Sequence, residues 1–596
     1  MWRKSFCIFT VLDVMAPPRT LRLTSVSLDD DDDPSPSPSP SPSLALEAST
    51  AADALEDDND AFRFSSSQEE EESRGLLSTT PSPTSSSTSS SGFLQPMADM
   101  ARLACPVVVE KVISRSAAIM SLAFVGQLAS PADLPGAALA STLTNVLGFS
   151  ILVGLNGALS TFGGQAFGAG NHKALGEALN TNILIAMLSC LPILVVLYNA
   201  EPILVNVFGQ DADLASSAAS FLRFLAPSVV GYAFVIAQGS WLTCQRMTMP
   251  GMLASAVATL LHPLNNILLI KYAHLGAHGA ALATVLVYLI QAGALFFYIA
   301  VINKATHNAL TVPTFSALRR QVGPFLALAL PSLGMLTEWW ASESLILMAG
   351  HLKPEICEHS NALSSLRLPI ACDAATATTA LSIYQTTNSV CFMLPLGIAI
   401  AVATRVANAL GAGKPDEAKT YAKVATVLTF GLGVVNCIVI NLGRSVWPRL
   451  FVPRNNADDG DTIRLADSFF ELESHLLTVL SVYVILDAFA VFGSAVCRGT
   501  GRQREGARVV LFSYWAVGVP LGYVLGFVAH MGPYGLVAGM FFGKMIHTSL
   551  MMFLVIRTDW KKEAENARKR VGANAPPPAC EIDDVELAEV PSSNNK

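Results

Sequence analysis

Two acidic side chains stand within apolar stretches in the second half of the chain, Glu338 in LTEWW and Asp487 in ILDAF. Charged groups inside a membrane are costly and commonly mark proton or ion pathways. A carboxyl buried there can exchange a proton within the physiological pH range. The two acids therefore predict a site of proton or cation exchange. A purely structural pairing with a cation or a polar helix neighbour is the alternative.

Neighbouring residues extend this candidate site. Glu343 is a third candidate acid, although an ideal helix places it about 140° around the axis from Glu338, toward a different surface. A cationic substrate can also bind over an aromatic face. The candidate aromatic residues are Trp339, Trp340, Tyr384 and Tyr483. Packing against lipid or neighbouring helices is the alternative for each of them.

The composition indicates a membrane environment. Of the 596 residues, 52% are hydrophobic and 14% are charged, and the mean hydropathy is +0.46. A soluble domain has about 25% charged residues. The net charge of -8 says nothing about a partner, because residues 1–95 hold 16 acidic and 6 basic side chains and the rest of the chain is nearly neutral.

Residues 1–95 form an acidic tail rich in Ser and Pro. Such a segment has too little apolar surface to offset the loss of chain entropy on folding, so we expect it to be disordered. Its first residues lack the small-residue cleavage site of a signal peptide, whereas an organellar transit peptide is an open alternative.

Apolar segments long enough to cross a membrane alternate with short polar breaks from residue 103 onward. We expect an all-α membrane protein with about twelve transmembrane helices, near residues 103–128, 137–162, 177–199, 217–241, 250–271, 279–302, 322–350, 378–404, 420–442, 470–495, 505–529 and 534–557. Loops on one side of this topology contain more Lys and Arg than loops on the other. This bias favours cytoplasmic termini.

Two phrases recur in the two halves of the chain. GLNGALSTFGGQAFGAG from Gly154 matches GIAIAVATRVANALGAG from Gly397 at an offset of 243, and HLGAHG from His274 matches HMGPYG from His530. Two homologous six-helix lobes in parallel order follow, unless Gly/Ala-rich helices match by chance. We expect an N-lobe at 96–310, a C-lobe at 311–560 and a cytoplasmic tail at 561–596, after the tail at 1–95.

The first repeated phrase contains candidate structural residues. Gln165 and Asn408 occupy equivalent places and are expected to order the end of their helices instead of touching substrate. Glycines permit tight turns and close backbone packing. The glycines expected to do so are Gly168, Gly170, Gly411 and Gly413.

The sequence resembles the multidrug and toxic compound extrusion (MATE) transporters, and their eukaryotic branch in particular. The resemblance covers roughly residues 96–560 and rests on GLNGALSTFGGQAFGAGNHKALG, PSLGMLTEWWASESLILMAG, LPLGIAIAVATRVANALGAGKPDEAK, LDAFAVFGSAVCRGTGRQREGA and TDWKKEAENARKR. It implies export of organic cations, drugs or secondary metabolites against inward flow of H+ or Na+. Glu338 and Asp487 match positions that look like the coupling acids of the family, and this match implies that Glu338 is the main proton or cation site and Asp487 its partner.

The chain departs from the family pattern at Ser160 and Ala409, where many relatives have acids, and at Ala490, where Gln is usual. The loss of two acids implies a narrower substrate range or less strongly cationic compounds. The loop near residues 352–379 looks long for the family, and a disulfide between its Cys357 and Cys372 is left open.

Other functions are weighed against export. GAGKP near Lys414 lacks the Gly and the Ser or Thr that a phosphate-binding loop needs, which disfavours an ATP-driven pump. The scattered Cys and His residues indicate no metal or other cofactor, and we expect no enzymatic activity. The expected partners are a small organic solute, H+ or Na+, and the lipids of the plasma or vacuolar membrane, without nucleic acid. A Na+-coupled antiporter, a lipid or oligosaccharide flippase and a non-transporting receptor or scaffold are the alternatives.

Overall fold

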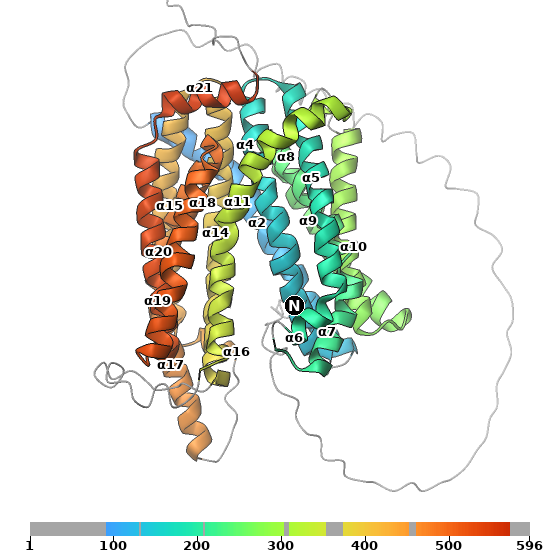
Figure 1. Cartoon of the computed structure of the whole chain (residues 1–596), viewed down its shortest axis with the longest axis vertical. Helices are drawn as coiled ribbons and strands as arrows, with labels where there is room; N and C mark the ends of the chain where they lie inside the picture. The colour runs from blue at the N-terminus through green and yellow to red at the C-terminus, as the bar shows by residue number, and fades with distance from the viewer. Residues whose placement is uncertain are drawn as a thin grey trace, which may run out of the picture. The chain divides into compact units, whose positions relative to one another are not determined.

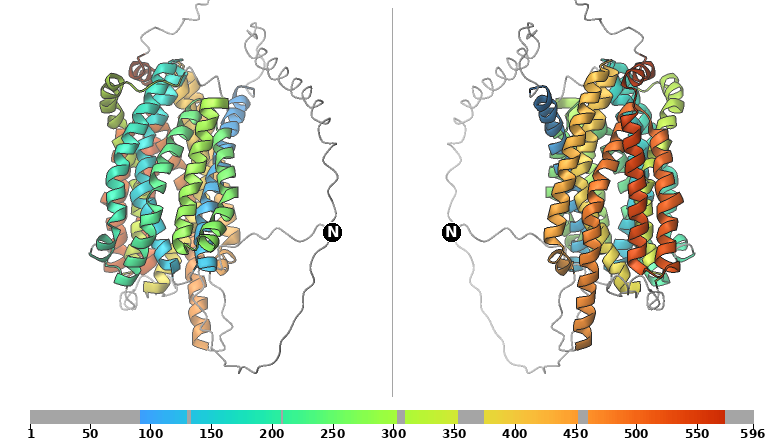
Figure 2. Two further views of the ribbon diagram at one scale, coloured as in Figure 1. Left: turned by 90° about the vertical axis from the view of Figure 1, so that its right-hand side faces the viewer. Right: turned by 90° about the vertical axis from the view of Figure 1, so that its left-hand side faces the viewer.

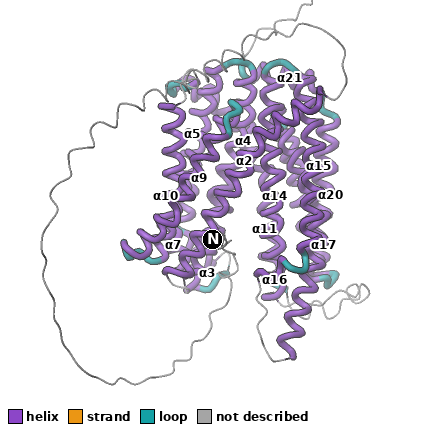
Figure 3. The backbone as a smooth tube through the Cα atoms, turned by 180° about the vertical axis from the view of Figure 1, so that it is seen from behind, coloured by secondary structure: helices purple, strands orange, loops and turns teal. Residues whose placement is uncertain are grey.

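The computed structural model describes residues 91–129, 133–206, 209–302, 309–352, 374–451 and 460–572. From Gly92 onward these residues belong to one compact unit. They form helices joined by turns, and no β-strand occurs among them (Figure 3). Eleven of these helices are long and apolar enough to cross a membrane, or twelve if one bent pair is a single span. The prediction of an all-α protein with about twelve spans is confirmed.

Two predictions concern residues that the structure does not describe. The disorder expected for residues 1–95 falls outside the described part of the chain, apart from its last five residues. Cys357 and Cys372 also lie outside it.

The first half of the described chain contains nine α-helices, with π-helical turns between or after them. The α-helices are α2 (Ser91–Phe124), α3 (Leu134–Thr144), α4 (Ser150–Gly168), α5 (His172–Tyr198), α6 (Ala200–Asn206), α7 (Ala212–Leu225), α8 (Ser228–Cys244), α9 (Met249–Ile267) and α10 (Ala277–Phe297). The π-helical turns are η2 (Val125–Ala129), η4 (Asn145–Phe149), η5 (Leu268–Tyr272) and η6 (Tyr298–Ile302). The span expected at 217–241 is broken: α7 and α8 meet at 50° beside Pro227, which has no N–H to continue a helix.

The second half is built in the same way. Its elements are α11 (Phe315–Ala349), α14 (Ala374–Gly411), α15 (Pro415–Gly443), α16 (Trp447–Phe451), α17 (Gly460–Thr500), α18 (Gln503–Val510), η8 (Leu511–Gly518), α19 (Val519–Tyr523), η9 (Val524–Val528), α20 (Gly532–Ile556) and α21 (Trp560–Arg570). The long helices of both halves run side by side, and α21 lies across one end of them (Figures 1 and 2). We call this end of the bundle the α21 end, α2 to α10 the N-lobe, and α11 to α20 the C-lobe.

The repeated phrases adopt repeated backbone conformations. Gly170 and Gly413 both have left-handed φ angles, of 68° and 72°, in the turns after α4 and α14. His274 and His530 have φ angles of 55° and 56° before α10 and α20, although a left-handed conformation is uncommon for a side chain of this size. The similarity of the two lobes therefore extends to the backbone conformation of single turns.

The first helix of each lobe begins against the other lobe. In α2, Asp99 forms an ion pair with Arg405 of α14, at 3.8 Å. In α11, Gln321 donates a hydrogen bond to Glu177 of α5 at 2.6 Å. Pro331 lies within α11, between this contact and the part of the helix that enters the C-lobe core. Both crossing helices therefore tie the lobes together.

Candidate functional site

Three charged side chains meet in the core of the C-lobe. The ammonium of Lys544, on α20, is bonded to the carboxylate of Glu338 on α11 and lies 2.6 Å from Oδ1 of Asp487 on α17. The side chain of Lys544 is 0% exposed, that of Asp487 5% and that of Glu338 19%. The structure thus brings the two predicted acids together through a lysine, and we call these three residues the charged cluster.

Aromatic and imidazole groups surround the cluster. The Lys544 Nζ lies 5.0 Å from the ring centre of Tyr483 and 5.4 Å from that of Tyr514, distances at which a cation interacts with a ring. Nδ1 of His547 lies 3.4 Å from Oε2 of Glu338 and 3.0 Å from the Tyr514 hydroxyl. The ammonium therefore has carboxylates on two sides and ring faces on two others.

Glycines bring α20 deep enough into the C-lobe for Lys544 to reach both acids. Gly539 approaches the backbone of Gly522, and Gly543 approaches the backbone carbonyl of Ser513, so closely that a Cβ on either would overlap the neighbouring segment. Such contacts between small residues let helices pack backbone to backbone. The residue directly after Gly543 is Lys544, which is held between α11 and α17.

The charges of the cluster compensate one another only in part. Moving an ion from water into a protein interior costs several kcal/mol, which a close opposite charge with good hydrogen bonds can offset. With all three groups ionised, two carboxylates face one ammonium and the net charge is -1. One negative charge is thus left for a proton or another cation to neutralise.

Several predicted residues lie away from the cluster. Glu343 accepts a hydrogen bond from the indole of Trp339 at 3.0 Å, and Trp339 is 40% exposed. Trp340 donates to Ser150 of α4 at 3.1 Å, so it joins the two lobes. Tyr384 of α14, by contrast, lies near the cluster, in the same apolar core as Tyr483. Of the candidate residues, Glu338, Asp487 and Tyr483 lie directly beside Lys544.

Two charged residues of the C-lobe with 0% exposure were missed by the sequence analysis. Lys544 is one, although a single lysine within the apolar run GMFFGKMIHTSL is itself a signal of a membrane-buried charge. Glu473 of α17 is the other: its side chain is 0% exposed, and neither carboxylate oxygen has a hydrogen-bond partner among the described residues. Its position near the start of a predicted span resembles that of an interfacial residue.

The repeated phrase forms a contact between the two lobes at the α21 end. Gly168 of α4 faces the backbone carbonyl of Asn408, and Gly411 of α14 faces the backbone carbonyl of Gln165. At the offset of 243 these are the same contact with the roles of the lobes exchanged. We call these four residues the inter-repeat contact. A side chain on either glycine would overlap the opposite carbonyl.

The side-chain amides of this contact bind neighbouring backbone carbonyls and the guanidinium of Arg246. Gln165 donates to the carbonyl of Gly499 at 3.1 Å. The Asn408 amide is oriented so that both its nitrogen and its oxygen form hydrogen bonds. Its nitrogen donates to the carbonyl of Gly164 at 2.8 Å, and its oxygen accepts from Nε of Arg246 at 3.1 Å. Burial lowers the pKa of the Arg246 guanidinium, which lies in the turn after α8. These bonds connect the ends of α4 and α14 to neighbouring segments.

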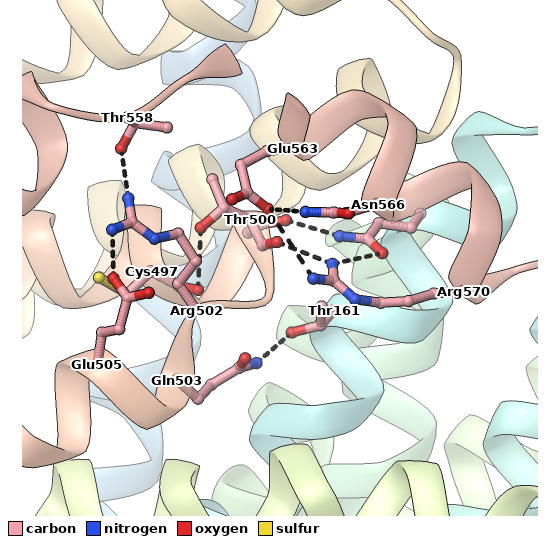
Figure 4. Close-up of polar contacts among 12 residues, drawn as sticks. Thr161, Cys497, Thr500, Arg502, Gln503, Glu505, Thr558, Glu563, Asn566 and Arg570 are labelled. Carbon is pink, nitrogen blue, oxygen red and sulfur yellow. Dashed lines mark hydrogen bonds and ion pairs between the residues drawn. The ribbon is translucent and has the colours of Figure 1, made fainter. Parts of the chain in front are cut away.

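The α21 helix adds further bonds between the lobes (Figure 4). Arg570 of α21 donates to the carbonyl of Thr500 in α17 at 2.8 Å and to the side chain of Gln165 in α4 at 3.4 Å. Beside it, Gln503 of α18 donates to Thr161 of α4 at 2.6 Å. Burial lowers the pKa of Arg570, and the carboxylate of Glu563 at 3.9 Å counteracts this effect. The α21 end is thus closed by backbone packing and by a polar network.

Fold and site together define a multi-pass integral membrane protein with two homologous lobes and a charged core in one of them. The MatE family model matches residues 106–268 and 372–524. Protein DETOXIFICATION 16 of Arabidopsis thaliana is 30% identical over 487 residues, which cover 81% of this chain and 92% of that protein. Multidrug and toxin extrusion protein 1 of Danio rerio is 30% identical over 478 residues, covering 80% of this chain and 75% of that protein.

A solved structure has the same architecture. The crystal structure of the eukaryotic MATE transporter AtDTX14 matches with a TM-score of 0.71 and 28% identity, covering 80% of this chain and 100% of that one. The chain belongs to the MATE family of transporters.

Proposed function

We propose that the chain is a secondary active antiporter that exports organic cations, drugs or secondary metabolites in exchange for H+. The charged cluster carries this proposal. Exchange requires a group that either a proton or the cargo neutralises, so that each ligand favours a different state of the protein. Glu338 fits this requirement because it is buried enough to need neutralisation and is the most exposed member of the cluster.

The geometry of the cluster favours H+ over Na+ as the coupling ion. Hard metal cations take several oxygen ligands at once. Both carboxylates of the cluster are already directed at one ammonium, which Na+ would have to displace. A proton needs a single carboxylate oxygen and leaves the bond between Asp487 and Lys544 intact.

The α21 end is proposed to face the cytoplasm, in the plasma membrane or the vacuolar membrane. Cytoplasmic segments near membrane helices are rich in Lys and Arg. The α21 helix, WKKEAENARKR, has this composition. At the same end of the bundle, Lys173 lies in the first turn of α5 and Lys414 directly precedes α15. The inter-repeat contact then closes the cytoplasmic side. The proposed lobe boundaries are 96–310 and 311–560.

Aromatic groups near the cluster would contact a bound organic cation. Tyr483 already faces an ammonium, and Tyr384 is packed in the same core. Trp340 bridges the lobes through Ser150 and would meet cargo that lies between them. We assign no enzymatic step to any of these residues.

The test is efflux of a fluorescent organic cation, ethidium, from proteoliposomes under an imposed pH gradient and then under a Na+ gradient. Glu338→Gln should reduce H+-driven efflux at least tenfold, because it removes the exchangeable carboxylate. Glu343→Gln is the matched control: it lies on the same helix, bonds to Trp339 and should retain most of the efflux.

Each outcome has a distinct meaning. Efflux driven only by Na+ would keep the antiporter and replace the coupling ion. Full H+-driven efflux by Glu338→Gln would remove this residue from coupling. If neither gradient moves ethidium, reconstitution with a labelled lipid or lipid-linked oligosaccharide tests a flippase, and failure to move any of these solutes favours a receptor or scaffold.

A further inference from the structure

Lys544 is a cation built into the proposed exchange site. It is fully buried and bonded to both acids, so the cluster carries one negative charge where two acids alone would carry two. A fully buried charge is stable only with its partner. The charge count of the site therefore depends on this residue as much as on the acids.

The three groups are not equally exchangeable. Asp487 and Lys544 are 5% and 0% exposed, and their charged atoms lie 2.6 Å apart. Separating them would leave two unpaired charges in the core. Glu338 is 19% exposed, and one of its carboxylate oxygens faces His547 in place of Lys544. The ion pair between Asp487 and Lys544 is thus the fixed part, and Glu338 is the most exposed part.

The other titratable groups near the cluster come from all the elements packed around it. They are Tyr384 and Cys391 of α14, Tyr483 of α17, Tyr514 of η8 and His547 of α20. Phenols and thiols are neutral at ordinary pH. His547 is the member of this set whose imidazole could hold a second proton, so the experiment below includes it.

We propose that Lys544 sets the exchange site to a charge of -1, so that one proton exchanges for one monovalent organic cation and divalent cations are disfavoured. The proposal rests on the proposed function and specifies the substrate class of the same site. In one half of the cycle a proton adds to Glu338 and the cluster becomes neutral. In the other half the proton leaves to water and a singly charged cargo takes its place.

Two dyes with the same ring system test this count: ethidium, which is monovalent, and propidium, which is divalent. Proton linkage makes the dissociation constant of a cation fall tenfold per pH unit for each proton displaced. In the acidic range, where the empty site is protonated, the dissociation constant of ethidium from the wild type should fall tenfold per pH unit. Propidium should bind to the wild type more weakly than ethidium. Lys544→Met has a site charge of -2. Its dissociation constant for a dye should fall by up to a hundredfold per pH unit, and it should bind propidium more tightly than ethidium.

A charge rescue provides the matched control. Asp487→Asn leaves Glu338 paired with Lys544, a neutral site, and should bind ethidium weakly at every pH. The double variant Asp487→Asn/Lys544→Met has Glu338 alone and returns the charge to -1. It should recover the tenfold dependence of wild type and its preference for ethidium. If Lys544→Met does not fold, this rescue tests the proposal by itself.

The results separate the inference from the proposed function. The role of Lys544 is overturned, while cation export stands, by either of two results. In the first, Lys544→Met keeps the wild-type dye preference and the tenfold change in dissociation constant per pH unit. In the second, the double variant does not recover these wild-type properties. If the dissociation constant of ethidium depends less on pH in His547→Gln than in the wild type, the assignment of the proton to Glu338 is overturned. If the wild type binds neither dye, and dye binding by the variants does not depend on pH, both the proposed function and this inference are overturned.

Discussion

The two lobes share a backbone plan but have different chemistry at their centres. At the offset of 256 that relates His274 to His530, Gly279 packs on the backbone of Leu269 as Gly535 packs on that of Leu525. The same offset pairs Lys544 with Tyr288. In the preceding helices, Arg246 and Gly501 take equivalent left-handed conformations at an offset of 255, which pairs Asp487 with Tyr232.

In the N-lobe the equivalent pair consists of two rings. The ring centres of Tyr232 and Tyr288 lie 5.3 Å apart at an interplanar angle of 72°, and Phe149 packs against both. Edge-to-face rings stabilise a core without burying a charge. The ion pair in the C-lobe has the same place in the repeat but requires mutual compensation. The repeated glycines and turns therefore specify the lobe fold, whereas the central pair specifies its chemistry.

The largest expected effect comes from breaking the central pair in each lobe. Lys544→Met leaves two buried carboxylates without their cation and should cost about 3–5 kcal/mol of stability. Tyr288→Phe keeps the ring and should cost about 1 kcal/mol or less, because only a hydroxyl is lost. Unfolding of both purified variants in a denaturant titration measures the difference.

The pH dependence of unfolding provides the control. The loss in Lys544→Met should be larger at alkaline pH, where both carboxylates are ionised and repel each other. Equal losses in the two variants, or a loss independent of pH, would mean that the charged pair and the ring pair are energetically alike.

The sequence predicts much of this architecture because hydrophobic length and repeated Gly-containing turns are local signals. Twelve apolar segments, the phrase ending GAG and the phrase around His274 suffice for a two-lobed helical fold. Pro227 is a local signal of the break between α7 and α8. The crossing of α2 and α11 onto the opposite lobes depends on packing between distant segments, so a window of sequence does not reveal it.

The candidate site is predictable in its acids but not in its balance of charge. Glu338 and Asp487 stand out because each is an acid within an apolar run. Lys544 stands out in the same way. Its importance depends on its contacts with Glu338 and Asp487, which lie 206 and 57 positions earlier in the chain. Glu343 and Trp339 lie beside Glu338 in sequence but outside the cluster, because helix periodicity turns them away.

A second way to sharpen the comparison is to move the ion pair into the N-lobe. Tyr288→Lys alone would bury an unpaired ammonium, and Tyr232→Asp alone an unpaired carboxylate. The double variant Tyr232→Asp/Tyr288→Lys should be more stable than the sum of the single changes predicts, with a coupling of up to about 3 kcal/mol. A denaturant titration of the four proteins in this cycle gives the coupling directly. No coupling would mean that the two lobe centres differ in geometry as well as in residue type.

The smallest effects are expected at the inter-repeat contact, where the lobes should behave alike. Gly168→Ala and Gly411→Ala each place a Cβ against a backbone carbonyl of the other lobe, so α4 and α14 must separate slightly, at a cost of about 1–3 kcal/mol. Gly170→Ala is the matched control, because no atom lies near its Cβ position and only its left-handed φ opposes the change, by about 1 kcal/mol. Thermal unfolding of the three variants should show equal losses for the first two and a smaller one for the third. Unequal losses at Gly168 and Gly411 would show that the asymmetry of the lobe centres extends to the contact that joins them, and the repeat would then be equivalent in backbone conformation but not in energy.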